Sequence, residues 1–241
     1  MGKSFSFFFT FLLLLFSGGA LFASGMLVKD STPDSVYVQY KALTGKDRLD
    51  KLLELSKKFI GLNPTIAKNL ASSATLLAIE IDAQEGQGYA LLYYGSAAFL
   101  LGDYFDAQES FNRSMEIAKR LHDQRLLVDI YDAQGSIYAS TGDFELAIEN
   151  YKLAFQILLK LNFPAERSNI IRKIGNIYFQ FGESNRALDF FQIALETRRK
   201  NNDSEGIGMA YNNIGRIYSD LGKYDQALDF FNKALEIKRT Q

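Results

Sequence analysis

The chain has 241 residues, a formal net charge of −1 at pH 7, and hydrophobic and aromatic contents of 47% and 14%. This composition supports a sizeable apolar core, and the near-zero charge predicts no general affinity for nucleic acid or anionic lipid. The absence of Cys excludes disulfides, thiolate catalysis and attachment through a lipidated Cys.

The N-terminus has the pattern of a secretory signal. Lys3 is followed by an apolar stretch without charge up to Lys29, and Ala23-Ser24-Gly25 supplies small residues for cleavage. We therefore expect residues 1–25 to be a signal peptide. The alternative is an uncleaved membrane anchor, because residues 4–28 are long enough to span a bilayer. Both alternatives predict export, as a secreted protein or one of a bacterial periplasm or cell envelope, which suits a chain without Cys.

Residues 26–47 form a polar lead, which we interpret as a linker with a brief helix within "SVYVQYKAL". Beyond it, three stretches nearly repeat one another at a spacing of 40 residues. They read "GSIYASTGDFELAIENY" over 135–151, "GNIYFQFGESNRALDFF" over 175–191 and "GRIYSDLGKYDQALDFF" over 215–231. Internal repeats of this length are typical of stacked repeat architectures.

Small and aromatic residues recur in phase at four positions of each repeat. They are Gly95, Gly135, Gly175 and Gly215; then Gly102, Gly142, Gly182 and Gly222; then Ala107, Ala147, Ala187 and Ala227; then Phe111, Tyr151, Phe191 and Phe231. A degenerate first copy keeps Ala67, Ala71 and Ala74. The predicted units are residues 48–87, 88–127, 128–167, 168–207 and 208–241.

Each unit is predicted to be a pair of helices, because apolar residues recur at helical spacing on both sides of the second recurring Gly. That Gly suits the left-handed residue that ends a helix, and Asp103 and Asp143 are expected to cap the following helix. The first Gly and the Ala allow close helix contact, while Tyr or Phe is expected to fill the gaps between neighbouring hairpins. A single hairpin cannot bury its apolar face, so the units must stack.

Over residues 48–241 this pattern resembles the tetratricopeptide repeat family. The usual period in that family is about 34 residues, so we expect the extra residues to lengthen the helices and the connecting loops. The resemblance implies an all-α fold, a right-handed α-solenoid of stacked antiparallel helical hairpins. It also implies a concave groove lined by the first helices, which binds proteins or peptides rather than performing catalysis.

The resemblance places the partner-binding groove at four positions in each first helix. These positions are Tyr89, Leu92, Ser96 and Phe99; Asp129, Asp132, Ser136 and Ala139; Asn169, Arg172, Asn176 and Phe179; and Met209, Asn212, Arg216 and Ser219. The predicted groove is apolar at its N-terminal end, acidic in the middle, and basic with amides at its C-terminal end. Such a groove suits an extended peptide or a partner helix of complementary charge.

A narrower hypothesis concerns three of the C-terminal residues. Chaperone-binding members of the family hold a terminal carboxylate with a basic residue, an Asn four positions later and an Asn in the next unit. Arg172, Asn176 and Asn213 occupy these places, but two further basic residues of such a clamp are absent. The alternatives are Asn residues that only pack, or a site for an acidic peptide at Arg172 and Arg216.

No constellation in the sequence predicts catalysis, a cofactor or a metal. The Gly-rich stretches "GQGYAL" at 86–91 and "GIGMAY" at 206–211 lie between units, where we interpret them as turns rather than phosphate-binding loops. His122 has no second His and no Cys to complete a zinc site, and no strand-elbow pattern presents a Ser to it. We therefore expect a protein that is not an enzyme and binds no metal or cofactor.

The final helix raises the question of partners. Phe230, Leu235 and Ile237 are expected to form a face with nothing after it. This face could be a frayed end, a surface for self-association or partner docking, or the mark of a shortened relative of a longer protein. The favoured function is a non-catalytic scaffold or adaptor for protein segments in the cell envelope. The alternative is the extracytoplasmic sensor portion of a bacterial histidine kinase or transcription regulator, lacking its output domain.

Overall fold

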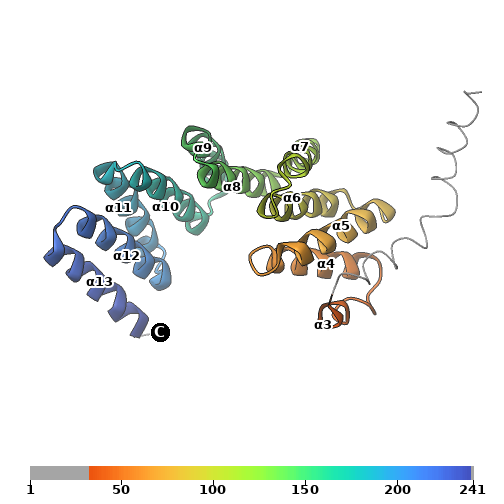
Figure 1. Cartoon of the computed structure of the whole chain (residues 1–241), viewed down its shortest axis with the longest axis horizontal. Helices are drawn as coiled ribbons and strands as arrows, with labels where there is room; N and C mark the ends of the chain where they lie inside the picture. The colour runs from red at the N-terminus through yellow and green to blue at the C-terminus, as the bar shows by residue number, and fades with distance from the viewer. Residues whose placement is uncertain (1–32, 240–241) are drawn as a thin grey trace, which may run out of the picture. The chain divides into compact units, whose positions relative to one another are not determined.

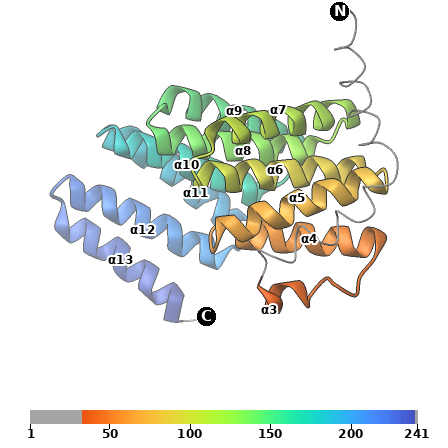
Figure 2. The same cartoon turned by 45° about the vertical axis from the view of Figure 1, so that its right-hand side comes forward.

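The computed structural model describes residues 33–239, which divide into two compact units at Leu126 and Leu127. The described part contains eleven helices and no strand. They are α3 (Asp34–Tyr37), α4 (Gly45–Phe59), α5 (Pro64–Glu80), α6 (Gln84–Leu100), α7 (Tyr104–Leu121), α8 (Gln124–Thr141), α9 (Phe144–Leu161), α10 (Pro164–Gln180), α11 (Ser184–Lys200), α12 (Ser204–Asp220) and α13 (Tyr224–Arg239). The predicted all-α fold of stacked hairpins is confirmed, with consecutive helices packed in antiparallel pairs (Figure 1, Figure 2).

The predicted signal peptide at 1–25 and the alternative anchor at 4–28 lie outside the described residues. Over residues 33–239, none of the helices combines the length and the apolar character that a bilayer crossing requires. Export therefore stays a prediction from the sequence.

A left-handed residue follows almost every long helix. The predicted Gly caps are confirmed, with φ between +71° and +88° at Gly102, Gly142, Gly182 and Gly222. A second series, which the sequence did not reveal, ends the second helices with φ between +53° and +57° at Asp82, His122, Asn162 and Asn202. Asp, His and Asn are the non-Gly residues that tolerate this conformation best. The lone His122 therefore has a structural role as the C-cap of α7.

The long repeat period is accommodated in the helices rather than in the loops. From α4 to α13 the helices have 15 to 18 residues. The connections between them are only two to four residues long. The expectation that the loops are also lengthened is wrong, because the left-handed caps reverse the chain within a few residues.

In the four hairpins from α6 to α13, the first recurring Gly lies against the aromatic ring sixteen residues later. A Cβ atom added at Gly135 would lie 2.6 Å from the Tyr151 ring, and one added at Gly215 would lie 2.7 Å from the Phe231 ring. The same contact joins Gly175 to Phe191 at 2.9 Å. These rings fill the space that the missing side chain leaves inside their own hairpin. They also pack towards the next hairpin, as expected, because Phe191 shares a buried cluster with Ile214 and Ile217 of α12.

Asp103 and Asp143 stand at the N-caps of α7 and α9 but do not act as capping side chains. Neither side chain accepts a hydrogen bond from the helix. Asp103 instead accepts from the Lys68 ammonium at 2.5 Å, and Asp143 accepts from the Thr141 hydroxyl at 2.8 Å. The backbone at both positions, with ψ near 65°, lies outside the extended region usual for an N-cap that bonds its own helix.

The two Gly-rich stretches lie within helices α6 and α12, which corrects their interpretation as turns. Gly88 is buried where an added Cβ would lie 2.5 Å from Leu126, and its carbonyl accepts a hydrogen bond from the Ser114 hydroxyl at 2.7 Å. Gly206 is likewise buried beside the side chain of Arg198. These residues allow close packing at helix starts, and neither stretch forms a phosphate-binding loop.

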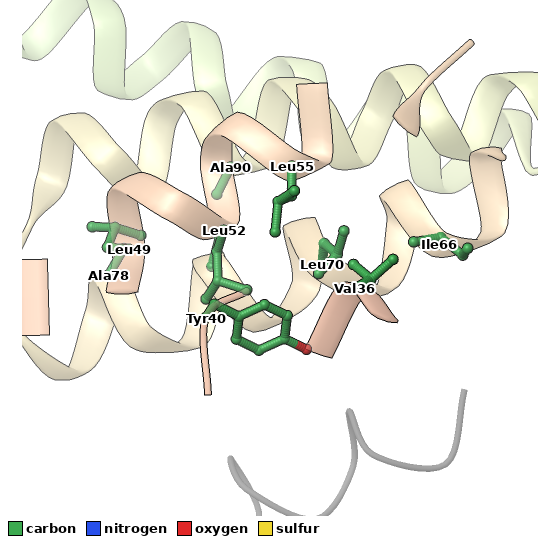
Figure 3. Close-up of a cluster of buried hydrophobic side chains, with 10 residues drawn as sticks. Val36, Tyr40, Leu49, Leu52, Leu55, Ile66, Leu70, Ala78 and Ala90 are labelled. Atoms are coloured by element: carbon green, nitrogen blue, oxygen red, sulfur yellow. The ribbon is translucent and has the colours of Figure 1, made fainter. Parts of the chain in front are cut away.

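Part of the polar lead packs on the first hairpin. The short helix α3 begins one residue before the stretch where a helix was expected and overlaps it, and Val36 and Tyr40 are 5% and 1% exposed. Figure 3 shows both side chains turned towards the apolar cluster that includes Leu52 and Leu70. Over these residues the lead covers the apolar side of the hairpin, so it does more than link.

Two of the three apolar residues that were expected to be uncovered on the final helix, α13, pack against α12. Phe230 stacks on Tyr218 with ring centroids 5.4 Å apart, and Ile237 packs close to Gly208. Of the three residues named for this face, only Leu235 is exposed, and Leu228 on the same helix is exposed as well. Self-association through this helix stays a prediction.

We expect Gly175→Leu to lower the free energy of unfolding by about 1–3 kcal/mol, because the new side chain would overlap the Phe191 ring. Thermal denaturation followed by circular dichroism measures the effect. Gly61→Leu is the control, since an added Cβ there meets no atom within 4 Å. Equal melting temperatures of the two variants would contradict the proposed contact.

Candidate functional site

In unit 2 the predicted groove residues lie on α8, α10 and α12, which contact one another through their side chains. We call this surface the first-helix face and define it by Asp132, Ser136, Arg172, Phe179 and Arg216. Lys173 of α10 reaches Asp132 of α8, and Arg216 of α12 lies over the ring of Phe179 of α10. The register of the repeats thus places residues about 40 positions apart next to one another.

The acidic middle of the predicted groove is partly neutralised. The Lys173 ammonium donates hydrogen bonds to the Asp132 carboxylate at 2.5 Å and to the Ser136 hydroxyl at 3.1 Å. Sequence reasoning did not select Lys173, because it lies one position after a predicted groove residue. The spacing could have indicated this pair. Lys173 lies 41 residues after Asp132, which is about one repeat, so the two residues are expected on neighbouring first helices.

Tyr151 lies beneath this ion pair. Its hydroxyl donates to Ser136 at 3.2 Å, and Lys173 lies 5.5 Å from the centre of its ring. Burial raises the pKa of the Tyr151 phenol to about 12, with Asp132 adding to the rise while the Ser136 hydrogen bond and Arg172 oppose it. The ring is the aromatic partner of Gly135, so the core contact and the surface charges meet at one residue.

This cluster brings a hydroxyl close to an amine and a phenol, a grouping that can suggest a nucleophile and its base. The Lys173 amine is held by a carboxylate as an ion-pair partner, which disfavours a role as a free base. The Ser136 hydroxyl donates a hydrogen bond to the backbone carbonyl of Asp132 at 2.8 Å. The arrangement is better explained as a polar link between α8, α9 and α10.

Arg172 borders a nearly closed hollow of about 10 Å³, close to the least space that one water molecule occupies. Met209 and Asn213 of α12 line the same hollow. The Arg172 Nε atom is buried and has no hydrogen-bond partner within residues 33–239. A buried guanidinium nitrogen without a partner costs free energy, so it favours any ligand oxygen that can reach it.

The predicted carboxylate clamp is only partly assembled. Arg172 and Asn213 line one hollow, whereas Asn176 is not among its lining residues. Asn169 is engaged elsewhere, because its side-chain oxygen accepts a hydrogen bond from Arg198 at 2.5 Å. Arg198, which sequence reasoning missed, also donates to Ser168 at 2.8 Å and forms an ion pair with Asp203.

The remaining groove predictions differ in exposure. Met209, Asn212, Arg216 and Ser219 are exposed on α12, while Asp129 and Ala139 are half-buried on α8. In unit 1, Tyr89, Ser96 and Phe99 of α6 are half-buried, and the Ser96 hydroxyl donates to the Leu92 carbonyl at 2.9 Å. Leu92 itself is 3% exposed, so its selection as a binding residue is wrong. It is one of the buried apolar residues of α6 and therefore belongs to the core.

The sequence matches the tetratricopeptide repeat model over residues 88–160 and 166–240, which together make up more than half of the chain. The chain belongs to the tetratricopeptide repeat family. A repeat scaffold is therefore the established architecture. No curated protein matches the sequence at a significant level.

Several solved structures have a similar fold at low sequence identity. BtubC of P. vanneervenii has a TM-score of 0.61 and 20% identity, over 80% of this chain and 74% of that chain. A Podosopora anserina protein of nearly identical TPR-like repeats has a TM-score of 0.62 and 16% identity, over 80% and 97%. Rap protein complexed with Competence and Sporulation Factor has a TM-score of 0.62 and 13% identity, over 80% and 64%. Identities this low show the fold alone.

We expect Tyr151 to remain protonated in the folded protein between pH 10 and about pH 12, where an unfolded Tyr ionises. This difference stabilises the fold below pH 10, and the contribution is lost as the pH rises through 12. Ultraviolet titration of tyrosinate should show a late phase that is missing in Tyr151→Phe. A difference between the two proteins that titrates near pH 10 would contradict the burial of this phenol.

Proposed function

We propose that the protein is a non-catalytic scaffold whose unit 2 binds an acidic protein segment along the first-helix face. The proposal rests on the ion pairing of the three cations on or beside that face. Within residues 33–239, neither Arg172 nor Arg216 forms an ion pair, whereas Lys173 between them is already paired with Asp132. The positive charge that remains available on the face is thus concentrated on α10 and α12.

The two arginines suit different parts of one extended segment. Arg172 lies beside Asn213 and forms no ion pair within residues 33–239, so its positive charge favours a carboxylate that approaches the face. Arg216 is exposed and lies 5.3 Å from the centre of the Phe179 ring, so it presents charge next to an apolar surface. Exposed Met209 adds a flexible apolar contact on the same helix as Arg216.

The family and its structural relatives support binding rather than catalysis. Repeat scaffolds of stacked hairpins present extended surfaces, and such surfaces are the usual binding sites of these architectures. The Rap protein that shares the fold was solved in complex with Competence and Sporulation Factor. A mixed charged and apolar surface gives specificity chiefly through charge complementarity with the partner.

Action in the cell envelope is the second part of the proposal. It rests on the uncharged apolar stretch before Lys29 and on the small residues at Ala23 and Gly25. Both a cleaved signal and an uncleaved anchor would place the repeats outside the cytoplasm.

We expect Arg172→Glu with Arg216→Glu to weaken the binding of acidic peptides by at least about tenfold, because two attractions become repulsions. The probe is a fluorescein-labelled pool of decapeptides rich in Asp and Leu, compared by anisotropy with a pool in which Asn replaces Asp. Arg113→Glu is the matched control, since Arg113 lies in unit 1 and is half-exposed. Unchanged affinity of the double variant, or equal binding of both pools, would contradict the site.

For the envelope, we expect the full chain expressed in a bacterium to be recovered from the periplasm or the membrane. Intact-mass spectrometry distinguishes the two forms, because cleavage near Ala23 or Gly25 removes the apolar segment. The control carries Leu13→Arg and Leu15→Arg, which interrupt the apolar run and should retain the protein in the cytoplasm. Cytoplasmic recovery of the unaltered chain would refute this part of the proposal.

A further inference from the structure

Unit 2 contains a second hollow, of about 440 Å³, which lies apart from the residues of the proposed binding function. We call the part of unit 2 that contains it the second-helix side, because α9 and α11 are second helices of their hairpins. It is lined by residues of α9, α10 and α11 and by the caps that end α9 and α11. Its size falls in the range of small-ligand sites in proteins. None of the five residues that define the first-helix face lines it.

The walls of this hollow are apolar and partly open to solvent. Phe155 of α9, Ile171 of α10 and Ile193 of α11 form them. Ile193 is 50% exposed, although Ile171 is only 7% exposed. Covering such a surface contributes roughly 25 cal/mol for each Å² of apolar area removed from water. The hollow therefore favours an occupant with an aliphatic part.

The charges at its edge are all positive. Among the described residues that line the hollow, Arg167 and Lys200 are charged, and no Asp or Glu is present. Within residues 33–239, neither of these two side chains forms an ion pair. Asn162 adds a side-chain amide to the lining. The polar side of the hollow thus favours an anion.

The helix dipole makes a positive charge favourable at only one of these two cations. Lys200 lies in the last turn of α11, where a positive charge stabilises the helix. Arg167 lies near the start of α10, where a positive charge is unfavourable and an anion is favoured. The N-cap of α10 is Phe163, which supplies no capping hydrogen bond from its side chain. An anion held by Arg167 would therefore offset an unfavourable local charge.

A hollow at the equivalent repeat position in unit 1 has different side chains, so the repeat fold does not require an apolar hollow lined by cations. The unit 1 hollow, of about 260 Å³, contains Asp106 and Glu109. There Arg113 pairs with Glu109 at 3.8 Å, and Asp106 pairs at 3.4 Å with Lys68, which is not among the lining residues. Arg113 stands at the repeat position that Ile193 occupies in unit 2. Unit 2 thus has an apolar hollow with unpaired cations where unit 1 has a neutralised polar one.

We propose that this hollow binds a carboxylate carried on a short aliphatic chain. The carboxylate pairs with the Arg167 guanidinium, which can donate two parallel hydrogen bonds, while Lys200 adds a second positive charge. The aliphatic chain lies against Phe155, Ile171 and Ile193. Two sources share this chemistry, namely a free aliphatic carboxylate and a peptide whose last residue is aliphatic.

The test uses the full chain with methyl-labelled Ile and two probes, octanoate and acetyl-Ala-Ala-Leu with a free C-terminus. We expect at least one probe to shift the Ile171 and Ile193 methyl signals saturably, and the probe that binds more tightly identifies the source. The C-terminal amide of the tripeptide is the neutral comparison for the peptide probe. If neither probe gives a saturable shift, or if the amide binds as tightly as the acid in the absence of octanoate binding, the proposal is wrong.

A double variant, Arg167→Met with Lys200→Met, keeps the aliphatic stems and removes both charges. We expect it to bind the preferred probe at least about tenfold more weakly. The matched control is Arg186→Met, because Arg186 is an exposed cation on α11 that pairs with Glu183. Unchanged affinity of the double variant would overturn the proposal. Should the variant fail to fold, the affinities of acid and amide for the unaltered chain still support or refute the carboxylate site.

Discussion

The structure depends on the contact between a Gly in the first helix of a hairpin and an aromatic ring in the second. At Gly135 and Gly215 an added Cβ would lie within 3 Å of the ring, so the two helices approach at a distance that only Gly permits. The ring then fills the vacated space and is itself buried, as Tyr151 and Phe191 show. Because packing of this density tolerates little added volume, this contact favours one register in each of the four hairpins from α6 to α13.

Fixed register has a consequence for the surface. Once each hairpin holds one alignment, residues about 40 positions apart come together on neighbouring first helices. This is how Lys173 reaches Asp132 and how Arg216 lies over Phe179. Tyr151 connects the core to this surface, since its ring packs on Gly135 and its hydroxyl contacts Ser136 beneath the ion pair. The core contact thereby positions the charges from which a binding function is inferred.

The two sides of unit 2 differ in how their cations are used. On the first-helix side, Lys173 is paired with Asp132, whereas Arg172 and Arg216 form no ion pair within residues 33–239. In the hollow between α9, α10 and α11, Arg167 and Lys200 lie beside apolar walls, and none of the described lining residues is an Asp or Glu. In the hollow of unit 1, the lining cation Arg113 pairs with Glu109, and the lining carboxylate Asp106 pairs with Lys68. Repeats of one design can therefore carry different surface chemistry, because the packing residues and the surface residues occupy separate positions.

The sequence by itself determined the helical hairpins, their repeat and the Gly caps, because these follow from local periodicity and from the conformation of single residues. It also indicated a binding scaffold through its resemblance to a repeat family. Local patterns could not show that Leu92 turns into the core, that Asp103 pairs with Lys68 instead of capping α7, or that His122 ends that helix. Only the tertiary structure decided these points and the pairing of Lys173 with Asp132. Burial and ion pairing depend on which side chains from distant repeats meet, and that is settled when the hairpins pack.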